Sequence, residues 1–172
     1  EGATGGREMY REAKLMLAVE LMKKKNFRGA MKFISQADLW PENLGVGKPY
    51  DDDLDKRLEC WMSYICLKNA GRTAEADSML DKIISFSPGV ENGVRNFVPS
   101  NEIITSLALK TTGKTKEAEE WLENKIKEHP GNILIEWSRA LYEDDRSFSL
   151  SESRKDANAR IINELLILGY LM

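Results

Sequence analysis

Apolar residues recur every three or four positions along most of this chain, a spacing that predicts α-helices. In the first such segment, 9–25, the residues Leu15, Ala18, Val19 and Met22 share one face. The other predicted helices are 27–37, 54–70, 73–86, 100–112, 115–128, 132–143 and 152–168. No segment shows the alternation of a strand, so the pattern predicts an all-α fold.

Helix-breaking residues support these boundaries. The five prolines all fall between periodic segments, where the loss of a backbone donor is tolerated. Gly71 and Gly113 stand where two predicted helices must end. Glycine adopts the left-handed conformation that closes many helices, so both are predicted to be C-terminal caps.

Two segments, 71–88 and 113–130, repeat one another. Each begins with a glycine, carries an alanine five residues later and ends with a proline 17 residues after the glycine. These alanines are Ala76 and Ala118, and an earlier copy without the glycine has Ala30 in the same place. Small residues at these positions predict close helix crossings, one in each copy.

This pattern resembles the tetratricopeptide repeat (TPR), a helical hairpin with small residues at the crossing and a closing proline. The resemblance covers residues 9–143. It implies a right-handed α-solenoid of antiparallel helical hairpins, with inserted loops and a C-terminal capping helix. The pairs are expected at 8–37, 54–86 and 100–128, followed by helices at 131–143 and 152–168. Together they would form one domain, 8–172, preceded by a linker or the edge of an expressed fragment at 1–7.

Two features depart from the TPR pattern. Successive alanines lie 46 and 42 residues apart, whereas the repeat is about 34 residues long. Tyr64 also stands where a first helix normally has a small residue. A generic helical bundle is therefore the alternative architecture.

The insertion at 38–50 mixes turn-forming residues with apolar and aromatic ones. Its candidate binding residues are Trp40, Leu44, Lys48 and Tyr50. The stretch looks like one found in large bacterial proteins, in which a β-rich, sugar-enzyme-like part precedes TPRs. That resemblance implies that this chain is the helical C-terminal part of such a protein. The structural interpretation is a loop that packs on the helices with Trp40 as its buried anchor.

Composition narrows the function further. The chain is 42% hydrophobic and 31% charged, with a net charge of −3, which argues against a collagen, a disulfide scaffold or a disordered tail. The mild charge argues against nucleic acid as a partner, and no stretch is apolar enough for a membrane span. We see no signal peptide, and the localisation stays unknown.

Some short stretches of the chain resemble motifs for catalysis or ion binding, but each lacks residues that the motif requires. The stretch 45–48 has the wrong spacing for a phosphate loop, and Pro49 replaces its hydroxyl residue. The aspartates of 51–55 are followed by Lys56 where a calcium loop has glycine, so they are predicted to cap a helix. His129, the single histidine, has no nucleophile at a suitable spacing. We therefore expect no enzyme, no cofactor and no metal site.

First helices of TPR pairs line a concave groove, and their inward residues are the candidate partner-binding residues. These are Leu15, Met16, Val19 and Met22 in the first pair, Leu58, Trp61, Met62 and Ile65 in the second, and Ile103, Ile104 and Leu107 in the third. Such an apolar, methionine-bearing wall suits an apolar helix or strand. It would be covered by the last helix or the inserted loops, or else by a second subunit or another domain.

The expected function is a non-catalytic interaction module. Its partner would be a protein or peptide, or another domain of the same larger polypeptide. An accessory C-terminal domain of a bacterial carbohydrate-active protein is the alternative. The last helix is expected to cap the array by packing on Trp137 and Leu141.

Overall fold

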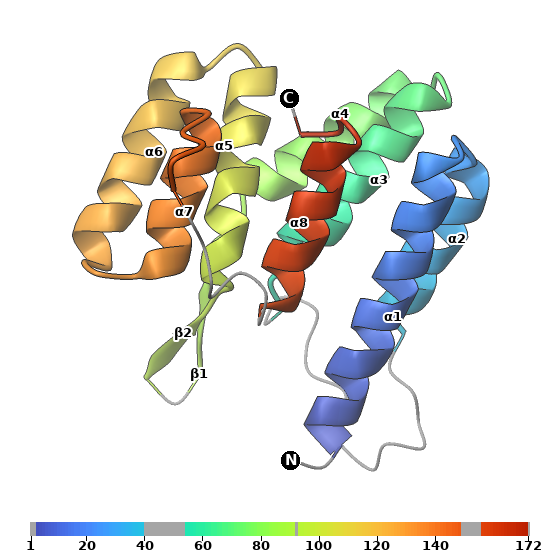
Figure 1. Ribbon diagram of the computed structural model, residues 1–172, viewed down its shortest axis with the longest axis horizontal. Helices are drawn as coiled ribbons and strands as arrows, with labels where there is room; N and C mark the ends of the chain where they lie inside the picture. The colour runs from blue at the N-terminus through green and yellow to red at the C-terminus, as the bar shows by residue number, and fades with distance from the viewer. Residues whose placement is uncertain (1–2, 40–53, 92, 149–155, 172) are drawn as a thin grey trace.

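Helices account for most of the chain in the computed structural model, which describes residues 3–39, 54–91, 93–148 and 156–171 (Figure 1). The all-α class predicted from the sequence is confirmed at this level. The helices are α1 (Ala3–Lys23), α2 (Phe27–Ala37), α3 (Arg57–Asn69), α4 (Thr73–Ile84), η3 (Pro99–Asn101, a 3-10 helix), α5 (Glu102–Thr111), α6 (Thr115–Glu128), α7 (Ile133–Tyr142) and α8 (Ala157–Ile167). The candidate loop residues Trp40, Leu44, Lys48 and Tyr50 lie outside the described residues.

Helices α1 to α6 form three antiparallel pairs, each joined by a three-residue turn (Figure 1). The predicted crossing alanines Ala30, Ala76 and Ala118 are buried, with 1% or less of their surface exposed. In the third pair the Ser106 hydroxyl donates to the Ala118 carbonyl at 2.9 Å. The two helices must approach closely for this bond to form, which agrees with a small residue at the crossing.

The turn within each pair has the same hydrogen-bonded cap. Gly71 and Gly113 adopt φ angles of +76° and +84°, so the sequence prediction for them is confirmed. After Gly71, the Arg72 amide donates to the Leu67 carbonyl at 2.9 Å, which closes the helix in a Schellman motif. The first pair lacks the glycine, and Lys25 takes the left-handed conformation in its place, with φ of 60°.

Segment 89–96 differs from the sequence prediction, which expected no strand. Strands β1 (Gly89–Glu91) and β2 (Val94–Asn96) pair antiparallel, with Val90 opposite Arg95. Three residues are too few to show alternation, so a periodicity search missed the hairpin. The Asn92-Gly93 dipeptide was the available signal, because Asn-Gly favours the tight turn of a two-residue hairpin.

The N-terminal boundary was also predicted wrongly. Helix α1 begins at Ala3, so residues from Ala3 onward are helical and do not form the linker expected at 1–7. Helices α3 and α8 begin at Arg57 and Ala157, later than the periodicity suggested.

Helix α8 lies elsewhere than predicted. It packs mainly on α1 and η3, and Figure 1 shows it between α1 and α5, whereas α7 packs on α5, α6 and η3. The expectation that α8 packs chiefly on Trp137 and Leu141 of α7 was therefore wrong. Its buried residues Ile161, Ile162 and Leu165 instead join the core that contains the first helices of the pairs. Burial there removes all three side chains from water, which stabilises this placement of α8.

This position of α8 changes the interpretation of the inner face. Ten of the eleven candidate groove residues are buried, with 8% or less of their surface exposed, and Met16 is half-buried. These ten residues belong to the core of the chain, so they are not open to a partner in this structure. Within the described residues, no helix combines the length and apolarity needed to cross a bilayer.

Candidate functional site

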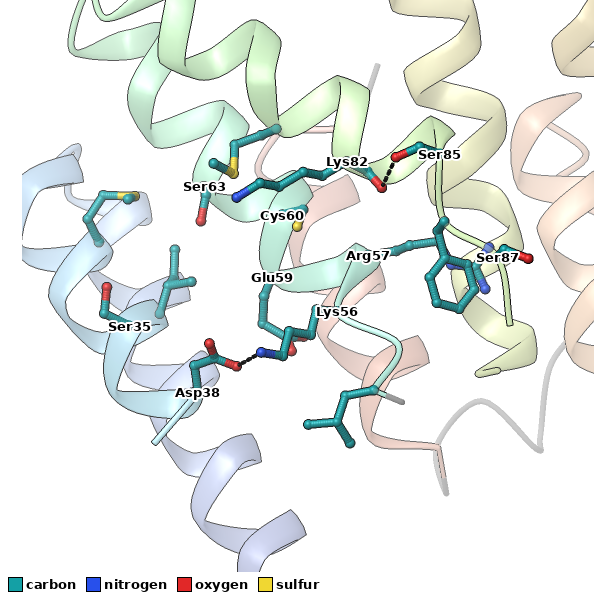
Figure 2. Close-up of a pocket in the computed structure, with 15 residues that line it drawn as sticks. Ser35, Asp38, Lys56, Arg57, Glu59, Cys60, Ser63, Lys82, Ser85 and Ser87 are labelled. Atoms are coloured by element: carbon teal, nitrogen blue, oxygen red, sulfur yellow. Dashed lines mark hydrogen bonds and ion pairs between the residues drawn. The ribbon is translucent and has the colours of Figure 1, made fainter. Parts of the chain in front are cut away.

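A groove of about 830 Å³ lies between α2 and α4, with α3 as its floor (Figure 2). Both α2 and α4 pack on α3, which separates them along this face. The groove is open to solvent, unlike the inner face.

The lining residues follow helical spacing on two of the helices. On α2 and its C-cap they are Met31, Ile34, Ser35 and Asp38. On α3 and its N-cap they include Lys56, Glu59, Cys60 and Ser63, and Arg57 also lines the groove. Both sets have the i, i+3, i+4, i+7 spacing of one helical face. Helix α4 adds Met79 and Lys82, three residues apart. The stripes on α2 and α3 and the two residues of α4 therefore face the same space.

Opposite charges meet at one end of this groove. The Lys56 ammonium lies 2.7 Å from a carboxylate oxygen of Asp38 and joins the start of α3 to the end of α2 (Figure 2). Lys82 extends across the groove, over Cys60 and Ser63 (Figure 2). No carboxylate of the described residues lies within ion-pair distance of Lys82. The positive charge of Lys82 therefore lies beside the apolar methionines of the groove.

The thiol in this groove is poorly suited to nucleophilic chemistry. Burial, reinforced by the nearby Glu59 carboxylate, raises the pKa of Cys60 to about 11. Burial alone raises the pKa of Cys66, outside the groove, to about 12. Both cysteines are free thiols. At neutral pH both are protonated, whereas a nucleophilic cysteine needs its thiolate.

These pKa values give a direct prediction for thiol reactivity. At about pH 8 the Cys60 thiolate fraction should be roughly 100-fold below that of an ordinary cysteine, so alkylation of the folded chain should be slower by at least that factor. The rate should rise about tenfold per pH unit until the pH approaches the pKa of Cys60. Iodoacetamide labelling followed by mass spectrometry measures this, with the guanidinium-unfolded chain as the control. Rapid labelling of folded Cys60 at neutral pH would contradict it.

The sequence pattern did not predict this groove, because only the helix faces that were expected to point into the core were considered. On α2 the periodicity placed Met31 and Ile34 on one core stripe with Ala30 and Ala37, and it did not select Ser35, which lines the groove beside them. Partly exposed methionines and serines at helical spacing were the available signal. In the described residues, no group of three His, Cys, Asp or Glu side chains is placed to hold a metal ion.

These observations define a mostly helical protein built from hairpins, with an open amphipathic groove on one face. Comparisons with models of protein families, with curated proteins and with solved structures gave no match.

Proposed function

We propose that this chain is a non-catalytic interaction module built of TPR-like repeats. Its partner would be a peptide segment of another protein, or of another domain in a larger polypeptide. The repeated pairs, their shared caps and the buried crossing alanines support the repeat interpretation. We place the binding site in the groove between α2 and α4 and not on the inner face, because α8 already covers that face.

The groove favours a partner segment with both apolar and acidic side chains. Met31 and Met79 flank it, and unbranched methionines adapt to side chains of different shape. Lys82 supplies a positive charge without a carboxylate partner in the described residues. A segment that buries apolar side chains against the methionines and directs a carboxylate to Lys82 would complement both features.

One observation carries this proposal: stripes from three helices converge on an open space of peptide size. Ligand sites are typically concave, mostly apolar and oriented by a few polar groups. Here the polar groups include Lys82, the Asp38–Lys56 ion pair and the hydroxyls of Ser35 and Ser63, around the methionines.

Selection from a displayed library of random peptides tests the proposal. Selected peptides should share apolar residues and at least one Asp or Glu, and their affinity can be measured by fluorescence anisotropy. Ser35→Trp should fill the groove and abolish binding. Lys82→Glu should weaken it by about tenfold, which corresponds to roughly 1.4 kcal/mol.

Lys116→Glu is the matched control, because Lys116 lies on α6, far from the groove lining, with 88% of its side chain exposed. This variant should bind like the parent. Selected peptides whose affinity is unchanged by both Ser35→Trp and Lys82→Glu would show that the groove is not the binding site. Failure to select any peptide would contradict a peptide-binding function.

A further inference from the structure

A second cavity, of about 240 Å³, is lined by the end of α4, by α5 and by the middle of α6. Helix α5 packs on both α4 and α6, so it forms the floor of this cavity as α3 forms the floor of the groove. The lining residues of α6 again have the i, i+3, i+4, i+7 spacing of one helical face. They are Glu117, Glu120, Trp121 and Asn124.

This cavity occupies the position of the groove in the next helical pair. Gly71 and Gly113 lie 42 residues apart, and the same interval relates three lining residues of the groove to three of the cavity. These pairs are Ser63 and Thr105, Met79 and Trp121, and Lys82 and Asn124. The cavity therefore has a tryptophan where the groove has a methionine, and an uncharged amide where the groove has its lysine.

The charge of the cavity is opposite to that of the groove. Among the described residues, its ionisable lining groups are the carboxylates of Glu117 and Glu120. Glu117 forms no ion pair in the described part of the chain. Glu120 pairs with Lys116 at 3.8 Å, but the lysine side chain is 88% exposed and solvent screens such a pair. Both carboxylates can therefore accept hydrogen bonds from a cation of a partner.

Trp121 gives the cavity a fixed aromatic wall. Its indole N–H donates to the carboxylate of Glu102, a buried residue, at 2.8 Å, which holds the ring in place. The Lys125 ammonium lies 4.6 Å from the ring centroid and pairs with Glu128 at 3.1 Å. Lys125 lines a small neighbouring cavity, and Trp121 lines both spaces. The ring therefore already contacts one cation and still borders the second cavity.

An arginine side chain complements these groups. Its planar guanidinium can stack on an indole and can form two parallel hydrogen bonds with a carboxylate. Ile84 and Leu109 provide apolar contacts for the methylene stem. An anion would instead meet two carboxylates. The volume is below the about 300–1,000 Å³ of a typical small-molecule pocket, so the space suits a single side chain.

We infer that this cavity binds an arginine side chain of a peptide partner. The guanidinium stacks on Trp121 and bonds to the carboxylates of Glu117 and Glu120, and its stem packs on Leu109. A site for one side chain gives a Kd of about 1 mM, which is too weak for the library selection that tests the groove. The inference goes beyond the proposed function, because it concerns a different space and the opposite charge.

Titration of the ¹⁵N-labelled chain with acetyl-Leu-Arg-Leu-amide, followed by NMR, tests this inference. The reporter is the indole N–H signal of Trp121, which should shift with a Kd of about 1 mM. The citrulline analogue keeps the shape of the arginine side chain and loses its charge, so it should bind about tenfold more weakly. Acetyl-Leu-Glu-Leu-amide should leave the signal unchanged, because its carboxylate is repelled.

Substitutions at exposed positions of α6 localise the effect. Asn124→Trp should fill the cavity and abolish the shift. Glu117→Gln combined with Glu120→Gln should weaken binding about tenfold. Glu123→Gln is the matched control, because Glu123 is an exposed carboxylate of α6 that does not line the cavity. Circular dichroism shows that each variant is folded.

Three results would overturn the inference. The first is that the arginine peptide, at about 10 mM, does not shift the Trp121 signal. The second is that the arginine and citrulline peptides bind equally well. The third is that the arginine peptide binds equally well to the parent and to folded Asn124→Trp. Ser35→Trp should leave arginine binding intact, and Asn124→Trp should leave peptide binding in the groove intact, which separates this inference from the proposed function.

Discussion

A chain that ends at Phe148, without α8, is expected to lose most of its stability and to self-associate. Helix α8 places Ile161, Ile162 and Leu165, none of them measurably exposed, on the inner face of the helical pairs. Burial of each such side chain contributes about 1.5–3 kcal/mol. Their removal would also expose the apolar residues of α1 and α3 beneath them, and surfaces of that kind promote association.

The segment that follows α8 adds further anchors. The Trp61 indole donates to the Tyr170 carbonyl at 3.0 Å, and the Tyr170 hydroxyl donates to the Met22 carbonyl at 2.8 Å. Leu171 is buried in the same core. The combined loss is comparable to the whole stability of an ordinary domain, about 5–15 kcal/mol.

Thermal unfolding followed by circular dichroism measures the stability, and light scattering after size exclusion measures the association. Ile167→Ala is the control, because Ile167 lies on α8 but is 76% exposed, so this variant should melt like the parent. A truncated chain that remained monomeric and equally stable would contradict the prediction. It would instead identify α8 as a detachable element that leaves the inner face free for a partner.

The second large effect is expected from Arg57→Met, which should lower the free energy of unfolding by about 3–5 kcal/mol. Arg57 is 2% exposed, and its guanidinium lies 2.7 Å from Asp55 and 3.0 Å from Glu102. It also donates to the Thr105 hydroxyl at 3.0 Å and lies over the Phe86 ring. Methionine fills much of the space but leaves two buried carboxylates without their cation.

Urea unfolding of the variant and the parent measures this difference. Arg72→Met is the matched control, because the Arg72–Glu75 pair is more than half exposed and solvent screens such a pair, so this variant should unfold like the parent. Adding Glu102→Gln to Arg57→Met should recover part of the loss, since it removes one of the stranded charges. A variant as stable as the parent would show that the Arg57 cluster contributes nothing to the fold.

Local features of this chain followed from its sequence. Helix periodicity, the caps at Gly71 and Gly113, and the small residues Ala76 and Ala118 all depend on neighbours within a few positions. Backbone hydrogen bonding and glycine conformation act over that same range, so the pattern alone was sufficient. The hairpin at 89–96 could also have been predicted from the sequence, because Asn-Gly is typical of a two-residue hairpin turn.

The location of α8 and the two cavities depended on tertiary structure. The apolar stripe of α8 is compatible with any apolar face, and only the arrangement of α1, α3 and α5 made the inner face the better one. Arg11, Arg57 and Glu59 resemble surface charges in the sequence, yet all are buried because their partners come from distant segments. Long-range pairing of this kind leaves no local pattern. The sequence therefore determined the helices and their pairing, and tertiary packing determined which faces are filled and which remain open to a ligand.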